Sequence, residues 1–235
     1  MTTYQERKFC IFCNSKNLDI LLDEDLKAPT SFSLCNVDES SNEKSKLMPY
    51  NIQCCNQCNS CQNKYVADLN LVYNKNHMDN YGSTKNRKFN LFSNFIYYCN
   101  KVNNCGIKNI IEVGACHDNL AVEIINLFDI SYTIIEPSIT IKNDKINYIH
   151  DYFENVDLNE IDANSIIMSD VFEHFYNPID ILKKIQNSQI EYIYLNHPDF
   201  DYMFQNKSFT LLNTEHTFVI EHQYLFSLFE NFGFR

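Results

Sequence analysis

Residues 110–120 read I-I-E-V-G-A-C-H-D-N-L, and this stretch decides the fold class of the chain. An apolar run that carries one acidic residue, Glu112, ends at Gly114 and leads through a polar turn into an amphipathic segment. A strand that turns through glycine into a helix is typical of doubly wound α/β folds, where the glycine lets a ligand approach the backbone. The sequence around Gly114 therefore predicts the first strand and helix of a parallel sheet.

Outward from this stretch, short apolar runs alternate with amphipathic segments, as in a parallel sheet that helices cover on both faces. The alternation predicts five strands, at residues 109–113, 132–135, 146–149, 165–168 and 192–195. It also predicts a helix at 179–185, opened by Pro178, and a last helix at 224–231, ended by Gly233. A covering helix near 85–102 is predicted by apolar residues at helical spacing, namely Phe89, Phe92, Ile96 and Cys99.

These predictions divide the chain into a cysteine-rich module at 1–75, a linker with the covering helix at 76–107, and an α/β domain at 108–235. The sequence stops shortly after the last predicted helix, where this fold class ordinarily adds two strands. We therefore expect the final strands to be missing. A truncated chain, a fragment, or a shortened relative whose sheet edge another subunit covers would each explain this.

Composition narrows the classes of partner. The 235 residues include 45% hydrophobic residues, enough for a substantial core, and carry a formal net charge of -11. Such acidity argues against nucleic acid and anionic membranes, which need clustered Lys and Arg, and favours a small-molecule partner. The polar start of the chain is not a signal peptide, and no apolar run approaches the roughly 18 residues of a membrane span, so we expect a cytoplasmic protein.

The cysteines predict a metal site. Cys10 with Cys13, and Cys55 with Cys58, form two CxxC pairs, the spacing that supplies four thiolates to a tetrahedral structural zinc. In a reducing compartment, clustered thiols more often bind metal than form disulfides. Cys54 and Cys61 offer an alternative register for the second CxxC, Cys58 with Cys61, and a set of free buried thiols is a further alternative. The isolated cysteines are expected to be small buried hydrophobes, namely Cys35, Cys99, Cys105 and Cys116.

The stretch around Gly114 resembles motif I of the class I methyltransferases, although only Gly114 of the expected glycines is present and Asp118 stands where another is usual. Further motifs, C-I-F-C, C-N-Q-C-N-S-C-Q, I-I-E-P, D-V-F-E-H-F-Y-N-P and N-T-E-H-T-F-V-I-E-H, resemble the sugar C-methyltransferases over nearly the whole chain. That family has a zinc module, a Rossmann-like domain that binds S-adenosylmethionine, and often a third domain that this sequence lacks. The resemblance implies methylation of a sugar or nucleotide sugar. O-methylation is an open variant.

The resemblance also implies which residues contact the cofactor. Glu136 ends the second strand, about 20 residues beyond Gly114, where a carboxylate can accept hydrogen bonds from both ribose hydroxyls. Asp151 follows the third strand and is expected near the adenine amine. The implied set of cofactor residues is Glu112, Gly114, Ala115, Glu136, Asp151, Tyr152 and Ser169.

Methyl transfer to a hydroxyl, or to a carbon beside a ketone, needs a base, and an imidazole with a pKa near neutrality is suitable. The resemblance implies His216 as this base, with adjacent Glu215 in support. Tyr81, His77 and His174 could position the substrate or stabilise an enolate. We expect His216 to follow the fifth strand, where loops converge on a bound ligand.

Three other readings stay open from the sequence. A nicotinamide-binding Rossmann domain is the nearest rival, but the sequence after Gly114 does not supply G-x-G-x-x-G. A catalytically inactive binding or scaffold protein would explain the eroded glycine loop. A zinc-ribbon adaptor for nucleic acid is disfavoured by the acidity and by the lack of a basic aromatic patch.

Overall fold

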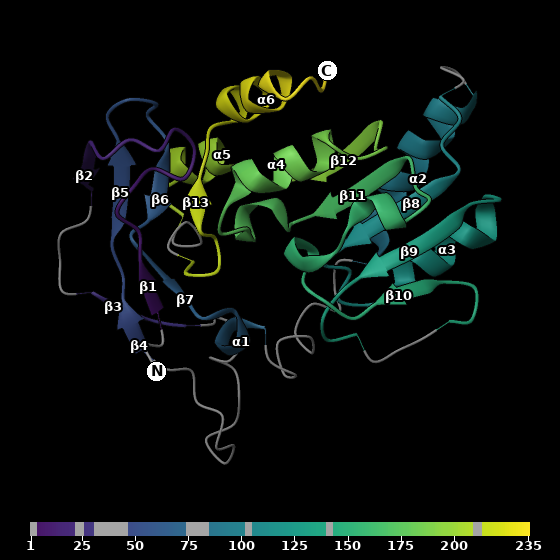
Figure 1. Ribbon diagram of the computed structural model, residues 1–235, viewed down its shortest axis with the longest axis horizontal. Coiled ribbons are helices and arrows are strands. Elements are labelled where there is room, and N and C mark those ends of the chain that lie inside the picture. The colour runs from purple at the N-terminus through teal and green to yellow at the C-terminus, as the bar shows by residue number, and fades with distance from the viewer. Residues whose placement is uncertain are drawn as a thin grey trace, which may run out of the picture. The chain divides into compact units, whose positions relative to one another are not determined.

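The computed structural model describes residues 4–21, 26–30, 47–73, 85–101, 105–139, 143–208 and 213–235 (Figure 1). Its contacts divide the chain into two compact units. The first comprises Met1–His77, Glu173–Lys183 and Pro198–Arg235, and the second comprises Met78–Phe172 and Lys184–His197.

A five-stranded parallel sheet is the framework of the second unit. Its strands are β8 (Asn109–Val113), β9 (Ser131–Ile135), β10 (Asn147–Ile149), β11 (Ser165–Ser169) and β12 (Tyr192–Asn196), in the order β10-β9-β8-β11-β12 (Figure 1). The first strand in sequence, β8, lies at the centre, so the order reverses there, as in doubly wound folds. The predicted Rossmann-like α/β class is confirmed, and each predicted strand is found to within a residue at either end.

The sheet and its helices share an apolar core. Helix α2 (Lys85–Lys101) contributes Phe92, Ile96 and Cys99, and helix α3 (Asn119–Leu127) contributes Leu120 and Ile124. Three of the four residues that predicted the covering helix are thus buried, with Phe92 and Ile96 each contributing roughly 1.5–3 kcal/mol, and Phe89 packs against this core while partly buried. The core also contains Ile110, Ile134, Ile167 and Tyr194 from the strands.

The first unit contains small antiparallel sheets. Strands β13 (Phe218–Val219), β6 (Cys61–Asn63), β5 (Ile52–Cys55) and β2 (Leu18–Ile20) form a four-stranded sheet in that order. Two pairs accompany it, β1 (Tyr4–Glu6) with β7 (Tyr65–Ala67), and β3 (Lys27–Pro29) with β4 (Leu47–Pro49). The helices that lie wholly in this unit are α1 (Leu69–Val72), α5 (Phe200–Gln205) and α6 (His222–Asn231). Helix α4 (Pro178–Gln186) begins at the predicted proline.

The last part of the chain groups differently from our expectation of one domain at 108–235. Strand β13 pairs with β6, with Phe218 opposite Gln62 and Val219 opposite Cys61 (Figure 1). Residues 198–235 therefore belong with the cysteine-rich module. The physical reason is that the edge of β6 offers unpaired backbone groups, which the short β13 satisfies.

Three 3₁₀ turns complete the described elements, at Phe153–Asn155, Leu158–Glu160 and Phe172–His174. None of the helices in the described ranges combines the length and the apolar character needed to cross a membrane.

Gly114 makes the turn from β8 possible. Its φ is +63°, in the left-handed region, and a Cβ at this position would lie 2.8 Å from Cγ2 of Val171. Gly106 has nearly the same φ, +65°, but a Cβ there would meet nothing within 4 Å. Both glycines therefore carry the cost of a left-handed backbone, but only at Gly114 would an added side chain also meet a steric contact.

We predict that Gly114→Ala destabilises the protein more than Gly106→Ala. Both variants lose about 1–2 kcal/mol of folding stability, because Ala must adopt a left-handed backbone conformation. Only Gly114→Ala must also displace the Val171 side chain. Guanidinium unfolding of the two variants measures the difference. Equal losses would show that the Val171 side chain moves aside at no cost, and Gly114→Ala with Val171→Ala tests that contact directly.

Candidate functional site

Four cysteines of the first unit converge on one point. One sulfur from each of Cys10, Cys13, Cys55 and Cys58 lies within 4.8 Å of all the others. The Sγ of Cys10 is 3.5 Å from that of Cys58, and the Sγ of Cys13 is 3.5 Å from that of Cys55. A zinc ion with Zn–S bonds of about 2.3 Å would hold sulfurs roughly 3.8 Å apart, so the cluster fits a tetrahedral thiolate site.

The two CxxC segments have the same backbone geometry. In each, the first cysteine's carbonyl accepts a hydrogen bond from the residue after the second cysteine, Asn14 at 2.9 Å and Asn59 at 2.8 Å. Both asparagines have φ of 59°. An amide within each loop also points at the first sulfur, Phe12 N at Cys10 and Gln57 N at Cys55, both at 3.4 Å. Such N–H···S contacts stabilise thiolate, which is the form that binds metal.

Burial and hydrogen bonding act differently on the thiols of Cys10, Cys13 and Cys58. Burial raises the pKa of Cys10, and burial raises the pKa of Cys13 to about 12. Burial also acts on Cys58, but the hydroxyl and amide of Ser60 and the thiols of Cys10 and Cys13 outweigh it and lower its pKa to about 7. The Ser60 hydroxyl lies 3.1 Å from the Cys58 sulfur. Cys58 therefore ionises more readily than Cys10 or Cys13.

Gln62 joins the two knuckles through its side-chain amide. Its Oε1 accepts from the amide of Ile11 at 2.9 Å, and its Nε2 donates to the carbonyl of Phe9 at 2.8 Å. Gln62 is almost completely buried, so both bonds are shielded from water. The first knuckle is thereby held beside the strand that follows the second.

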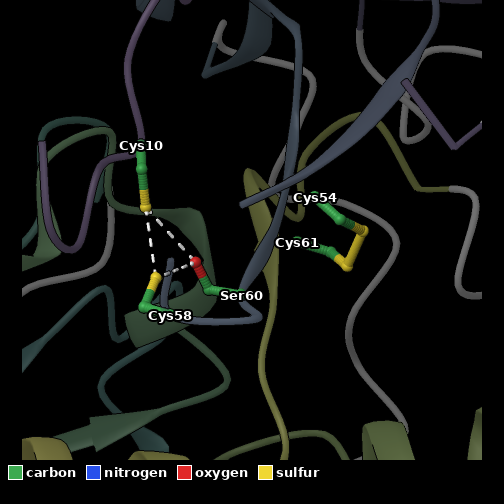
Figure 2. The surroundings of a disulfide bond; sticks show 5 residues. All are labelled: Cys10, Cys54, Cys58, Ser60 and Cys61. Atoms are coloured by element: carbon green, nitrogen blue, oxygen red, sulfur yellow. Dashed lines mark hydrogen bonds between the residues drawn. A yellow bond between two sulfur atoms is a disulfide. The ribbon is translucent and has the colours of Figure 1, made fainter. Parts of the chain in front are cut away.

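Cys54 and Cys61 form a disulfide, which the sequence analysis did not predict (Figure 2). They lie directly opposite each other on β5 and β6, with Cα atoms 4.1 Å apart. A cross-strand pair of this kind points its side chains to one face of the hairpin. The alternative CxxC register, Cys58 with Cys61, is thus not the arrangement seen, because Cys61 is bonded to Cys54. No disulfide joins the other described cysteines outside the cluster, Cys99, Cys105 and Cys116.

Acidic side chains gather at the carboxyl ends of the strands in the second unit. Glu112 lies on β8 and is 4% exposed, and Glu136 directly follows β9 and is 7% exposed. The Glu136 Oε1 accepts from the amide of Ser138 at 3.0 Å. Beyond β10, Asp151 Oδ1 accepts from the amide of Tyr152 and from Asn155 Nδ2, both at 2.7 Å. Ser169 ends β11 and is buried, while Ala115 is partly exposed.

Glu112 has an unusual titration. Complete burial raises its pKa to about 7, although the Tyr132 hydroxyl donates to it at 2.9 Å and Lys88 supplies a positive charge, both of which lower the pKa. Asp118 and Glu136 raise it further by repulsion. Glu112 therefore titrates near neutral pH rather than near 4.5.

The loops around this edge contain strained backbone. Cys116 has a φ of 62° and Asp170 a φ of 54°, both in the left-handed region although neither is glycine. Cys116 follows Gly114, and Asp170 follows β11. Strain of this kind costs of order 1–3 kcal/mol and clusters at functional sites.

Two histidines of the first unit lie together. The rings of His174 and His216 meet edge to face at a centroid distance of 5.2 Å. The Tyr73 hydroxyl lies 3.0 Å from His174 Nδ1, and the Glu173 carboxylate lies 3.8 Å from His174 Nε2. One potential ligand atom from each of Glu173, His174 and His216 lies within 4.8 Å of the other two, close enough to hold a metal ion.

His216 differs from the expected near-neutral base. Burial lowers its pKa to about 4, and the neighbouring Glu215 carboxylate raises it only in part. Its Nδ1 is buried and makes no hydrogen bond within the described ranges. In the sequence, the residue comes after the fifth strand, β12, with helix α5 between them, and it precedes β13.

Residues of the cysteine-rich module hold the His216 segment in place. Asn63 Nδ2 donates to the carbonyl of His216 at 2.8 Å. The Arg7 guanidinium donates to the carbonyls of Tyr176 and Thr217, so it joins the segment after His174 to the segment after His216. Sequence reasoning missed Arg7 and Asn63, because their partners are backbone carbonyls. It also missed Tyr73. Tyr81 and His77 lie outside the described residues.

We predict that purified protein, never exposed to chelator, contains about one equivalent of zinc. Cys58→Ser should reduce that content strongly, because it removes one of four ligands, whereas Cys105→Ser, outside the cluster, should not. Elemental analysis measures both. Less than half an equivalent in the wild type would contradict the zinc assignment.

We also predict a pH effect from Glu112. Because its folded pKa is raised from 4.5 to about 7, the protonated form favours folding, and this contribution is lost as pH rises through 7. Between pH 5.5 and pH 8 the loss is about 2 kcal/mol. Glu112→Gln, neutral throughout, should lack this loss, and the exposed Glu123→Gln should retain it. Parallel pH profiles for wild type and Glu112→Gln in denaturant unfolding would refute the assignment.

No family model matches the chain, and a search of curated proteins finds no match. Among solved structures, the plantazolicin methyltransferase BpumL in complex with SAH is similar over 64% of this chain and 65% of its own, less than two thirds of its length, at 16% identity and a TM-score of 0.49. A SAM-dependent methyltransferase from Archaeoglobus fulgidus aligns over 64% of this chain and 69% of its own, at 15% identity and a TM-score of 0.47. A possible histamine N-methyltransferase from Thermotoga maritima aligns over 69% and 82%, at 14% identity and a TM-score of 0.42. None of the three is described as acting on a sugar, so the resemblance to sugar methyltransferases rests on the sequence motifs alone.

Proposed function

We propose that the chain is an S-adenosylmethionine-dependent methyltransferase that acts on a carbon or hydroxyl of a sugar or nucleotide sugar. The observation that carries the proposal is the placement of Gly114 and Glu136 at the carboxyl ends of the two neighbouring strands β8 and β9. In open α/β sheets, ligands bind at this edge, where the strand order reverses.

The residues at this edge suit S-adenosylmethionine better than a nicotinamide dinucleotide. A dinucleotide places its pyrophosphate at the helix that follows the first strand. Here the residue at the start of α3 is Asp118, which is 6% exposed and accepts a hydrogen bond from the Tyr148 hydroxyl at 3.1 Å. A buried carboxylate at that position repels phosphate. S-adenosylmethionine has no phosphate, and its adenosine offers hydroxyls and an amine to carboxylates.

The ribose and the adenine of the cofactor each have a candidate partner. The buried Glu136 carboxylate suits the two ribose hydroxyls, which donate hydrogen bonds. Asp151 is held in one orientation by Tyr152 N and Asn155 and suits the adenine amine. Ala115 follows β8 and Ser169 ends β11, so both lie at the carboxyl edge of these neighbouring strands.

When bound, the cofactor supplies a methyl group on a sulfonium, and its transfer needs no metal. The acceptor atom forms a bond to the methyl carbon while the sulfur–carbon bond breaks, and the acceptor's proton passes to a base. We assign this proton to Nδ1 of His216, which is neutral at pH 7 because its pKa is lowered to about 4. The buried carboxylates of Glu215 and Glu173 would stabilise the resulting imidazolium.

His174 is assigned a positioning role. A hydrogen bond from the Tyr73 hydroxyl to Nδ1 would place the ring proton on Nε2, on the side of Glu173. This arrangement fixes the ring that packs on His216. Tyr73 thereby supports the site, and the role that the resemblance gave to Tyr81 stays a prediction.

We predict that His216→Gln lowers turnover by about 10²- to 10⁴-fold and leaves cofactor affinity nearly unchanged. The acid limb of the rate profile should lie near pH 4 rather than 6.5, because a lowered pKa keeps the accepting form populated to lower pH. Transfer of labelled methyl groups to a panel of nucleoside diphosphate sugars measures the rate, and calorimetry measures affinity for S-adenosylmethionine.

His222→Gln is the matched control, since this histidine lies in the same unit, is 38% exposed and pairs with Asp199 and Asp201. If His216→Gln keeps activity within threefold of wild type, His216 is a packing residue. If the wild-type protein does not bind S-adenosylmethionine at all, the chain is a binding or scaffold protein rather than an enzyme.

A further inference from the structure

The strand order divides the cofactor edge of the second unit into two sides. Glu136 and Asp151 follow β9 and β10, on one side of the central strand β8. If these residues bind ribose and adenine, as the proposed function requires, the amino-acid end of S-adenosylmethionine extends toward β8 and β11. That end carries an ammonium and a carboxylate. The carboxylate needs a cationic partner, since the edge contains Glu112, Asp118, Glu136 and Asp170.

Lys88 of α2 reaches this side of the sheet. Its Nζ lies 3.3 Å from the carbonyl oxygen of Ser169, the last residue of β11, and 3.7 Å from Oδ2 of Asp170. Its charge also acts on Glu112 of β8. The side chain is 26% exposed, so it is partly desolvated yet open to a ligand. Lys88 thus places a positive charge between the ends of β8 and β11.

Other described lysines of the second unit are placed elsewhere. Lys184 donates to the carbonyls of Phe153 and Glu154, at 2.7 and 2.9 Å, in the segment after β10. Lys108 and Lys145 precede β8 and β10, and so lie toward the opposite ends of the strands. The contacts of Lys88 are also incomplete. A carbonyl at 3.3 Å and a half-exposed carboxylate at 3.7 Å leave donor capacity in an ammonium that has three N–H groups.

We propose that Lys88 binds the carboxylate of the methionine moiety and so selects cofactors that carry an amino-acid carboxylate. This inference rests on the proposed function, and it adds a residue to which the sequence motifs gave no role. Lys88 is a binding and specificity residue, and it takes no part in proton transfer.

Decarboxylated S-adenosylmethionine provides a direct test, because it keeps the sulfonium and the ammonium and lacks only the carboxylate. Calorimetry of wild type should show tighter binding of S-adenosylmethionine than of the decarboxylated form. Lys88→Met should weaken binding of S-adenosylmethionine by about 10- to 100-fold, the worth of a charged hydrogen bond, and change binding of the decarboxylated form by less than threefold. Lys88→Arg, which keeps the charge, should recover part of the loss.

Glu136→Ala is the matched comparison. It removes a ribose contact that both ligands share, so it should weaken both by the same factor. The decarboxylated ligand also controls for folding, because a misfolded Lys88→Met protein would bind neither.

The outcomes separate the two proposals. Wild type that binds neither ligand contradicts the proposed function. If the wild type binds both ligands, and Lys88→Met weakens binding of both equally or of neither, the proposed function stands and the role of Lys88 is overturned. If Lys88→Met weakens binding of S-adenosylmethionine but not of the decarboxylated form, the role of Lys88 is supported.

Discussion

The first unit depends on the convergence of four thiols from two segments that lie more than 40 residues apart. Cys10 and Cys13 come from one knuckle and Cys55 and Cys58 from the other, and Gln62 and Asn63 follow directly on the strand that leaves the second knuckle. Gln62 returns to the first knuckle through Ile11 and Phe9. Asn63 donates a hydrogen bond from its side-chain amide to the carbonyl of His216. The position of the proposed base is thus linked, through two adjacent amides, to the cysteine centre.

Arg7 extends the same dependence. Its side chain is partly buried, and this burial lowers its pKa to about 10, which still leaves it charged at neutral pH. A buried charge must be satisfied, and here the acceptors are the carbonyls of Tyr176 and Thr217. Burial thereby makes the geometry of the histidine segments specific, since any shift would leave the cation without acceptors.

The sequence predicted what periodicity and spacing encode. The five parallel strands and the helix that carries Phe92 and Ile96 were found because burial follows a regular pattern, and the four cysteines because two pairs share one spacing. Strand β13 was not predicted, since two residues contain no period. Lys88, Arg7 and Asn63 were not predicted either, because backbone carbonyls accept from any suitable donor and leave no mark on the sequence. The pKa of His216 follows from burial, which a single residue letter does not report.

The grouping of residues into units has a consequence for how the chain is made. The first unit needs residues 1–77 together with 173–183 and 198–235, so the chain passes from one unit to the other four times. During synthesis, β6 emerges long before β13, its partner along one edge. That edge of the cysteine-rich module therefore stays uncovered until residues 218–219 have been synthesised. Long-range pairing of this kind slows folding and exposes strand edges to other chains. A metal ion bound early at the two knuckles would give the waiting module a structure of its own, before its last strand arrives.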